Sequence, residues 1–276
     1  MIRTPIHAGT WWAIARAVVC ALIVIYLIAP MVIVLIISFS SAPFLTFPPP
    51  GFSLQWYEKF FVSADWRSAL FMSLRVAVVV ASLSVLVGAA AAFGLVRGNF
   101  AGKRALFLLA VAPLLVPVII VALCLYVALA DMGLLGTFVG LVIGHLIVAV
   151  PYALIILVGA VRGLDRNLEY AAATLGARPF LVLRRIVLPS LAPGLITAWI
   201  MAFLHSFDEL LVTLFLVGRQ TPTLPIKMWS DIRIQLDPVI SAASSSIVTV
   251  IALVIILTQL RSLLPGRTRR RADGLV

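Results

Sequence analysis

Long apolar stretches separated by short polar connections dominate the chain. A helix that crosses a bilayer needs roughly 20 mostly apolar residues. Six stretches meet this requirement, at about residues 13–37, 69–96, 105–130, 137–160, 191–217 and 241–264. The first is too long for the core of a signal peptide, so we expect it to remain as a span. The pattern predicts an all-α integral membrane protein with six transmembrane helices in a single domain, residues 1–276.

Composition and charge support a membrane protein and argue against a nucleic-acid binder. The chain is 63% hydrophobic and only 11% charged, and its mean hydropathy is +1.18. A net charge of +11 is also common in proteins that bind nucleic acid. However, the cations are scattered over short loops and do not form an aromatic-studded basic face. We therefore expect a lipid bilayer as the surroundings and no nucleic acid.

The cations lie mostly on one set of connections, which predicts the orientation. Loops rich in Lys and Arg stay in the cytoplasm. The cation-rich connections carry Arg3, Arg16, Arg97, Lys103, Arg104, Arg162, Arg166, Arg178, Arg184, Arg185, Arg261, Arg267, Arg269, Arg270 and Arg271. The opposite connections carry only Lys59, Arg67, Arg219, Lys227 and Arg233. Both termini, including a basic tail at 265–276, are therefore expected in the cytoplasm.

Two spans contain residues that shape helices. Gly136, Gly140 and Gly144 form a doubled Gly-x-x-x-Gly pattern, which lets helix backbones approach closely. Packing inside the bundle is the favoured use, and dimerisation across a pore axis is the alternative. Pro113 and Pro117 should bend the third span, because proline removes a helical hydrogen bond.

Two segments between spans have the character of interfacial helices. Ser53 can cap a short helix that carries Trp56, Phe60 and Phe61. A second helix is expected at about 224–236. Tryptophan favours the headgroup level of a membrane, so simple anchoring is the favoured role. Docking of a soluble binding protein is the alternative.

Catalytic and metal-binding patterns are missing from the sequence. Cys20 and Cys124 lie in different apolar spans and read as small hydrophobic residues. The segment GNFAGKR at 98–104 has too few residues between its glycines for a phosphate loop, and Arg104 stands where a Ser or Thr is needed. We therefore expect no ATP hydrolysis and no cofactor on this chain.

The fifth span contains an unusual charged cluster, His205, Asp208 and Glu209. An ionised carboxylate at a helix centre costs about 2.5–3.5 kcal/mol, so two adjacent ones need compensation. Helical spacing puts all three on one face and Phe203 and Phe207 on the other. An acidic face turned into a water-filled path would attract cations.

Two other interpretations of this cluster stay open. The acids could form an internal ion pair with Arg75 of the second span. Alternatively, the fifth span could end near Leu204, which would leave the acids at the surface. His145 in the fourth span is expected to be an ordinary packing residue.

The longest charged interruption between apolar halves runs from Glu169 to Pro189. The apolar residues Leu168, Ala172 and Leu175 recur with helical spacing. Gly176 is a typical helix stop. Pro179 suits the first turn of a second helix, which Pro189 would end. The segment predicts two short helices with a sharp corner between them.

This segment resembles the cytoplasmic coupling loop, or EAA loop, of permease subunits of ATP-binding-cassette importers. The family pattern is Glu-Ala-Ala, three residues, Gly, nine residues and Ile-x-Leu-Pro. The positions in register are Ala171, Ala172, Gly176, Ile186, Leu188 and Pro189. Tyr170 stands where the family's glutamate usually stands, so Glu169 is a candidate to take over its acidic contact.

The resemblance implies a fold and a set of partners. It implies a MetI-like importer-permease helical bundle in the cell inner membrane, with residues 161–190 as the coupling loop. The residues of the loop that were named above, with Arg184 and Arg185 at its rim, would contact an ATPase subunit. The implied partners are a second permease subunit of different sequence, two ATPase subunits that bind ATP and Mg, and an external substrate-binding protein.

The resemblance extends from the first span to the TLPIKMW segment at 223–229 and favours the polyamine-type branch of these permeases. In that branch a Ser-Phe-Asp-Glu segment occurs in the fifth span, matched here by residues 206–209. The implied substrate path is His205, Ser206, Phe207, Asp208 and Glu209. The branch also handles opines, aminoalkylphosphonates and other small solutes.

A stand-alone channel or ion-coupled carrier is the alternative from another functional class. Six spans with intramembrane acids would suit such a carrier too. The coupling-loop segment argues against it, because a self-sufficient carrier needs no surface for an ATPase.

Overall fold

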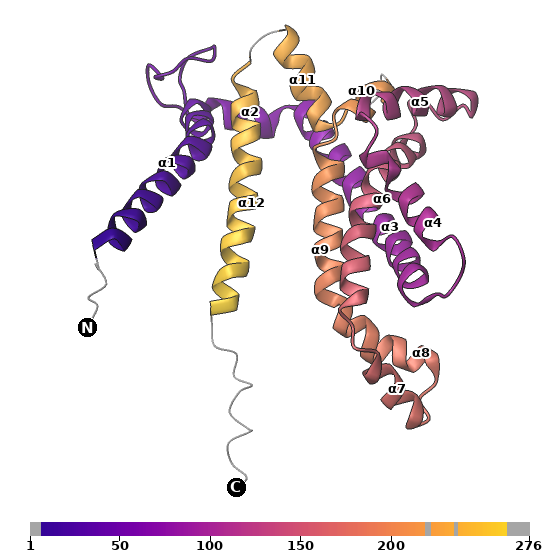
Figure 1. The fold of residues 1–276 in the computed structure, drawn as a ribbon. Coiled ribbons are helices and arrows are strands. Elements are labelled where there is room, and N and C mark those ends of the chain that lie inside the picture. The colour runs from indigo at the N-terminus through magenta and orange to yellow at the C-terminus, as the bar shows by residue number, and fades with distance from the viewer. Residues whose placement is uncertain (1–6, 219–221, 235–236, 264–276) are drawn as a thin grey trace. The chain divides into compact units, whose positions relative to one another are not determined.

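The structure, a computed structural model, describes residues 7–218, 222–234 and 237–263 (Figure 1). Within these ranges the chain is helical, apart from turns, loops and an isolated bridge between Ser40 and Phe52. It divides into two compact units, which are Ala64–Ser230 and the residues on either side of that range. The all-α architecture predicted from the apolar pattern is confirmed. The assignment to a single domain stays a prediction.

The unit that contains the two ends of the chain is built on three helices. These are α1 (His7–Ser38), α2 (Gln55–Val62) and α12 (Val239–Leu263), and α12 contacts both of the others. The Tyr57 hydroxyl lies 2.7 Å from Ser38 Oγ and donates to Ser245 Oγ at 3.0 Å, which joins all three helices. The outer faces of α1 remain apolar and exposed, as expected for a helix in lipid.

Two helices form in the segments for which interfacial helices were predicted, and their place at the membrane interface stays a prediction. α2 carries the predicted aromatic residues, and α11 (Leu224–Ile234) corresponds to the second segment. The capping prediction was wrong in detail, because Leu54 is the N-cap. Ser53 lies one residue earlier, and its hydroxyl accepts from the Gln55 amide at 3.1 Å.

The other unit is organised around three long helices: α3 (Ala64–Arg97), α6 (Phe138–Arg162) and α9 (Leu188–Phe207). α3 packs against α6 and α9, and α6 packs against α9. The buried face of α3 consists largely of small residues, namely Ala69, Ser73, Ala77, Ala81, Ser84, Gly88 and Ala92. Small residues let helix backbones come close in a membrane, where van der Waals packing drives association.

The third span is sharply broken, as its two prolines predict. It consists of α4 (Lys103–Val111), the short 3-10 helix η1 (Ala112–Leu114) and α5 (Val118–Asp131). α4–η1 and α5 meet at an angle of 98°. Pro113 lies in η1 and Pro117 is the N-cap of α5. Neither proline can donate a backbone hydrogen bond, so the helix turns where they stand.

The fifth span differs from its prediction at both ends. A single helical run, Pro179–Phe207, includes α8 (Pro179–Val182), the π-helical segment η2 (Leu183–Val187) and α9. Pro189 therefore does not end a helix. At the other end α9 stops at Phe207, and α10 (Leu211–Leu216) follows after a break. The prediction of one helix through residue 217 was wrong.

The π-helical segment explains how the helix continues through Pro189. In η2 the Leu188 amide bonds the Leu183 carbonyl, five residues back. Such a π-bulge shifts the hydrogen-bond register by one residue. Proline is tolerated in the first turn of a helix, and Pro189 stands in the first turn of α9, immediately after the shift.

The glycines of the fourth span pack inside this unit, as favoured from the sequence. A Cβ atom on Gly144 would collide with the Leu216 side chain of α10. Gly136 has a φ of +70° and lies beside Gly218, so it forms part of the turn before α6. In the described residues, the Gly144 surface therefore serves packing within the chain.

Four described helices are long and apolar enough to cross a membrane, or five if the bent third span counts as one crossing. The sixth predicted span corresponds to α12, in which Val239–Leu253 forms a shorter apolar stretch. Several sequence predictions fall outside the described residues. These are the end of the sixth span at residue 264, the basic tail 265–276, Arg3, Arg219 and the last residues of the segment 224–236.

Candidate functional site

The Glu169–Pro189 segment folds into a corner that we call the elbow, residues 166–189. Its first helix is α7 (Arg166–Thr174), and the Asp165 side chain caps it by accepting from the Asn167 amide at 2.9 Å. Gly176 then adopts a φ of +78°, which glycine tolerates and other residues rarely do.

Two backbone hydrogen bonds close α7 at this corner. The Gly176 amide donates to Ala173 O at 3.0 Å, and the Ala177 amide donates to Ala172 O at 3.0 Å. This pair of bonds is the Schellman motif. Pro179 then begins α8. The first predicted helix, the stop at Gly176 and the start of the next helix at Pro179 are therefore confirmed, whereas that next helix is not short.

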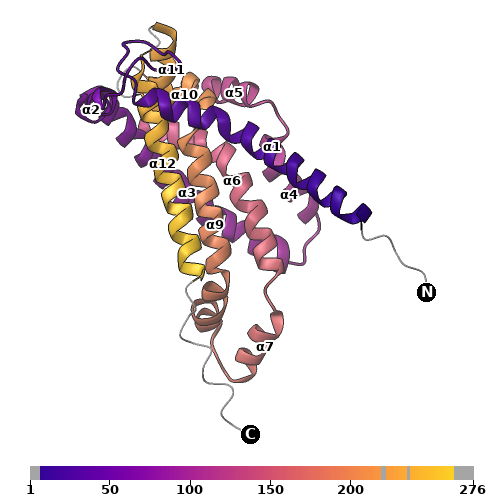
Figure 2. The ribbon, with the colours of Figure 1, turned by 90° about the vertical axis from the view of Figure 1, so that its left-hand side faces the viewer.

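The elbow lies at one end of its unit, beyond the ends of α3, α6 and α9 (Figures 1 and 2). No side chain of α7 is buried. Next to the corner, Leu175 is 88% exposed and Phe180 is 72% exposed. Exposed apolar side chains beside cations mark a surface that another protein can cover.

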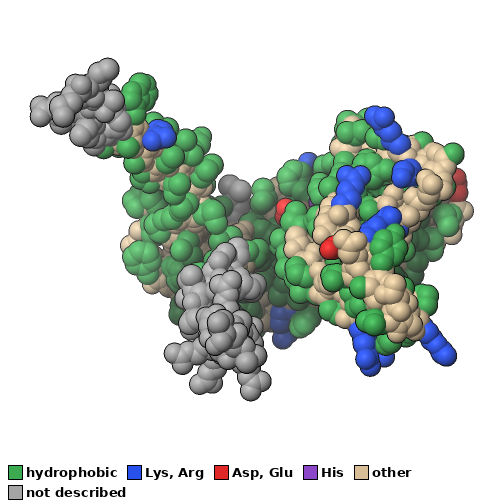
Figure 3. All heavy atoms as spheres, turned by 60° about the horizontal axis from the view of Figure 1, so that its bottom comes forward, with side chains coloured by type: hydrophobic (Ala, Val, Ile, Leu, Met, Phe, Trp, Pro, Cys, Tyr) green, Lys and Arg blue, Asp and Glu red, His purple; other side chains and the backbone are tan. Residues whose placement is uncertain are grey.

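Figure 3 looks onto this end, where Lys and Arg side chains are prominent and acids are few. The exposed cations of the elbow include Arg166, Arg178, Arg184 and Arg185. The other residues suggested by the resemblance divide by exposure. Tyr170, Ala171, Gly176, Leu188 and Pro189 are exposed, whereas Glu169, Ala172 and Ile186 are half-buried.

Glu169 has a partner within the chain. Its Oε1 atom accepts from Arg97 Nη2, at the end of α3, at 2.6 Å. The resemblance suggested Glu169 as a contact for an ATPase, and that role stays a prediction. Sequence reasoning placed Arg97 only among the cytoplasmic cations. No local spacing could reveal this pair, because the two residues are far apart in the chain.

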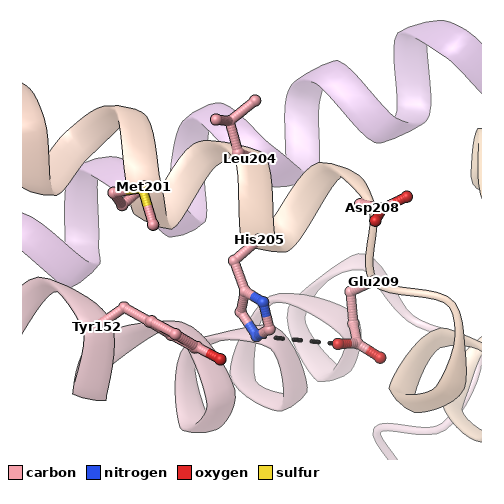
Figure 4. Close-up of a pocket in the computed structure, with 6 residues that line it drawn as sticks. All are labelled: Tyr152, Met201, Leu204, His205, Asp208 and Glu209. Carbon is pink, nitrogen blue, oxygen red and sulfur yellow. Dashed lines mark ion pairs between the residues drawn. The ribbon is translucent and has the colours of Figure 1, made fainter. Parts of the chain in front are cut away.

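A cavity of about 370 Å³ lies where α9 ends (Figure 4). α6 contributes one lining residue, and α9 with the break after it contributes the others. The lining residues are Tyr152, Met201, Leu204, His205, Asp208 and Glu209. Three of the five residues predicted for a substrate path therefore line one cavity.

Glu209 is the buried acid of this cavity, with 8% exposure. Its Oε1 atom accepts from the Val212 amide at 2.9 Å and so caps the start of α10. Its Oε2 atom lies 3.9 Å from His205 Nε2, the contact drawn as a dashed line in Figure 4. His205 and Glu209 therefore lie next to each other, in keeping with their i, i+4 spacing.

Asp208 is placed differently from its neighbour. It is the exposed C-cap of α9, and its carboxylate points away from the His205–Glu209 pair (Figure 4). The prediction that all three residues share one helical face was wrong, because the helix ends at Phe207. The acids nevertheless line the same cavity, from opposite sides of the turn.

Tyr152 is a cavity residue that sequence reasoning missed. Its ring centroid lies 4.5 Å from that of His205. An aromatic face next to carboxylates is a favourable place for an ammonium group. A tyrosine in an apolar span gives no local sign of such a role.

The two alternatives for the acids now have answers. Within the described residues neither acid pairs with Arg75, whose guanidinium lies 5.3 Å from the centroid of the Phe138 ring. The second alternative was partly right, since α9 ends at Phe207. Yet only Asp208 is exposed, whereas Glu209 is buried.

Ser206 and Phe207 face away from the cavity. Ser206 is buried against α6. Phe207 stacks on Phe203, with ring centroids 5.8 Å apart, and Phe203 stacks on Trp199 at 5.3 Å. Phe203 and Phe207 therefore stack along a face of α9 that differs from the face of His205, in keeping with their helical spacing.

His145 joins the two sides of the break. Its Nδ1 atom lies 2.9 Å from Ser206 Oγ in α9, and its Nε2 atom lies 2.8 Å from Thr213 Oγ1 in α10. The imidazole is 1% exposed. The sequence assigned His145 to packing, and the structure adds that it holds α9 and α10 in a defined arrangement.

The electrostatics of the cavity favour a cation. The C-terminal carbonyls of α9 give that helix end a partial negative charge. Asp208 stands at this end as the C-cap, and Glu209 follows it. In the described residues no group of three or more possible metal ligands occurs.

Residues 84–270 match the family model described as "Binding-protein-dependent transport system inner membrane component". The chain belongs to this family. The match includes both the elbow and the acidic cavity. The chain is therefore a membrane permease of an importer and not an enzyme, in agreement with the resemblance found in the elbow.

Curated relatives cover most of the chain. The putrescine transport system permease protein PotI of Escherichia coli K12 is 32% identical over 92% of this chain and 91% of its own length. The spermidine/putrescine transport system permease protein PotC of the same organism is 28% identical over 85% and 89%. The molybdenum transport system permease protein ModB of Mycobacterium bovis is 32% identical, over 69% of this chain and 77% of its own.

A solved structure shows the same fold at low sequence identity. It is the crystal structure of a bacterial ABC transporter involved in the import of the acidic polysaccharide alginate. The matched chain aligns with a TM-score of 0.70 and 13% identity, over 95% of this chain and 100% of its own length. This likeness supports the importer-permease bundle expected from the sequence.

Proposed function

We propose that this permease passes a small organic cation of the polyamine type from an external binding protein to the cytoplasm, driven by ATPase subunits seated on the elbow. The observation that carries the proposal is the exposed corner at Gly176. Leu175 and Phe180 flank it and are mostly exposed. Large apolar side chains exposed together beside cations are typical of a surface that another protein covers.

The assembly has four kinds of component in this proposal. The permease pairs with a second permease of different sequence, and two ATPase subunits bind ATP and Mg. An external binding protein delivers the solute. Both termini and the elbow face the cytoplasm, which the distribution of Lys and Arg between the connections supports.

ATP-driven closure of the ATPase pair would push on the elbow. The helical run Pro179–Phe207 begins in the elbow and ends at the acidic cavity. The run is continuous, because η2 carries the helix through Pro189. A displacement at α8 would therefore be transmitted along this helix toward His205.

Docking can be tested with one exposed leucine. Leu175→Asp removes an apolar contact without disturbing the packing of this chain, since Leu175 is 88% exposed. We expect the variant to insert normally and to lose the ATPase subunit during purification of the complex. Phe52→Asp is the matched control, because Phe52 is 76% exposed but lies outside the elbow. Retention of the ATPase by Leu175→Asp would refute the docking role.

The acidic cavity supports a cationic solute. Two carboxylates, a helix C-terminus and the Tyr152 ring all favour positive charge. The relatives that cover most of the chain are named for putrescine and spermidine. The molybdenum-system relative matches a smaller part of it.

The cargo is tested with the complete complex and its binding protein in ATP-loaded liposomes. We expect uptake of labelled putrescine or spermidine that depends on ATP. ATP-dependent uptake of an opine or an aminoalkylphosphonate, with no uptake of either polyamine, would overturn the cargo and leave the permease role intact. Uptake that needs no ATPase subunit would favour the stand-alone carrier.

A further inference from the structure

The ion pair between Arg97 and Glu169 connects two helices that matter for coupling. Arg97 is the last residue of α3, and Glu169 lies in the first half of α7. The guanidinium and the carboxylate are 2.6 Å apart, and their side chains are 19% and 31% exposed. A charge-assisted bond in a partly desolvated place is stronger and better defined than a fully exposed one.

Two weaker hydrogen bonds surround this pair. Arg97 Nη2 also donates to Leu164 O at 3.4 Å, and Arg166 Nη2 donates to Val96 O at 3.4 Å. Side chains from both segments therefore donate hydrogen bonds across the contact between the end of α3 and the start of α7. Cations suit this place, because the carbonyl end of α3 carries partial negative charge.

α7 has little else to hold it against the bundle. None of its side chains is buried. Its main contacts with other helices are with α8 and η2, which belong to the elbow itself. Its link to α3 is therefore polar, and the Arg97–Glu169 pair is the shortest bond in it.

We propose that Glu169 acts through Arg97 as a strut that makes α7 and α3 move as one body, and that it does not touch the ATPase. The inference rests on the proposed function, in which the elbow receives the ATPase. α3 packs along both α6 and α9. A push on α7 thus reaches the bundle through α3 as well as through the helical run Pro179–Phe207.

A strut and a direct contact with the ATPase predict different results for a charge swap. In the strut, Arg97→Glu and Glu169→Arg each place two like charges together, and the double variant restores opposite charges. We expect each single variant to transport about tenfold less solute per ATP hydrolysed, which corresponds to a coupling free energy in the usual range. The double variant should recover most of this loss. If Glu169 instead touches the ATPase, the double variant stays as impaired as Glu169→Arg.

The controls separate this inference from the proposed function. Lys103→Glu reverses an exposed charge near the same end of the bundle, and we expect no change in uptake. Gly176→Asp tests the elbow itself. If Gly176→Asp is normal, the proposed function fails; if it is impaired while the charge swap fails to restore uptake, only the strut is refuted.

A distance measurement tests the strut without transport. Spin labels at Gly94 on α3 and Thr174 on α7, both exposed, would report whether the two helices move together, in a background with Cys20 and Cys124 replaced by Ser. We expect one narrow distance distribution in the assembled complex and a clearly broader one after Glu169→Gln. An unchanged distribution in Glu169→Gln would overturn the proposal.

Discussion

His145 Nε2 in α6 lies 2.8 Å from Thr213 Oγ1 in α10, while Nδ1 of the same ring lies 2.9 Å from Ser206 Oγ in α9. One buried side chain thus spans the break in the fifth span. The Thr213 hydroxyl also donates to Glu209 O at 2.8 Å, and Glu209 caps α10. These hydrogen bonds therefore hold the break between α9 and α10, which lines the acidic cavity, in one arrangement.

His145→Ala should destabilise this arrangement. It leaves the hydroxyls of Ser206 and Thr213 without their ring partner, at a cost of about 1–3 kcal/mol for a buried unsatisfied group. We expect a lower midpoint of thermal unfolding in detergent, with insertion retained. The double variant Ser206→Ala/Thr213→Val removes both partners, so His145→Ala should cost little more in that background. Equal losses in both backgrounds would contradict the bridging role.

Substitution of Gly176 should impair coupling through the strain of a positive φ, through the added charge, or through both. Left-handed backbone costs most residues about 1–2 kcal/mol, whereas Asn and Asp adopt it more readily, so the added charge is the main change in the Asp variant. No atom lies within 4 Å of a Cβ built at Gly176, so collision does not contribute. We expect Gly176→Asp and Gly176→Arg to insert but to lose ATPase assembly or coupled uptake. Gly176→Asn should retain more of both, and normal transport by the Asp and Arg variants would disprove the assignment of the elbow.

Neutralising the cavity acids should weaken uptake of a cation. Glu209→Gln removes the charge but keeps an oxygen that can accept from the Val212 amide, so the α10 cap survives. Losing a charged hydrogen-bond partner costs about 1.5 kcal/mol or more, which corresponds to roughly a tenfold loss of apparent affinity. The same direction is expected for Asp208→Asn.

Initial rates of putrescine uptake by the assembled complex measure this effect. Glu58→Gln neutralises an exposed acid of α2, outside the cavity, and should leave the rates unchanged. The cavity would have no part in the path if Asp208→Asn/Glu209→Gln moved putrescine as fast as the parent at the same protein level.

Two glycines of α6 offer a matched test of packing. A methyl group at Gly144 would collide with Leu216 and approach Val212 Cγ1 at 3.1 Å, whereas Gly159 has open space. Gly144→Ala should lower stability by about 1–3 kcal/mol, as overpacking does. Gly159→Ala should be neutral or stabilising by up to about 1 kcal/mol, because alanine favours a helix. Thermal unfolding in detergent compares them, and equal midpoints would show that α10 is not packed against Gly144.

Several features could be predicted because they depend on the properties of single residues or of near neighbours in the sequence. The corner at Gly176 follows from backbone freedom, and the breaks at Pro113 and Pro117 follow from missing amide donors. The i, i+4 spacing of His205 and Glu209 predicted that their side chains lie on the same side, and the two are in contact. Asp208 was misplaced because helical spacing cannot reveal that the helix ends one residue earlier.

The sequence by itself therefore determined the apolar helices, the elbow with its exposed corner and the presence of acids in the fifth span. These depend on residues close together in the chain. Only the tertiary structure decided that Arg97 bonds Glu169, that Tyr152 completes the cavity and that His145 joins α9 to α10. Each of these contacts joins helices that meet only after the bundle has packed, and no local periodicity encodes which side chains then come face to face.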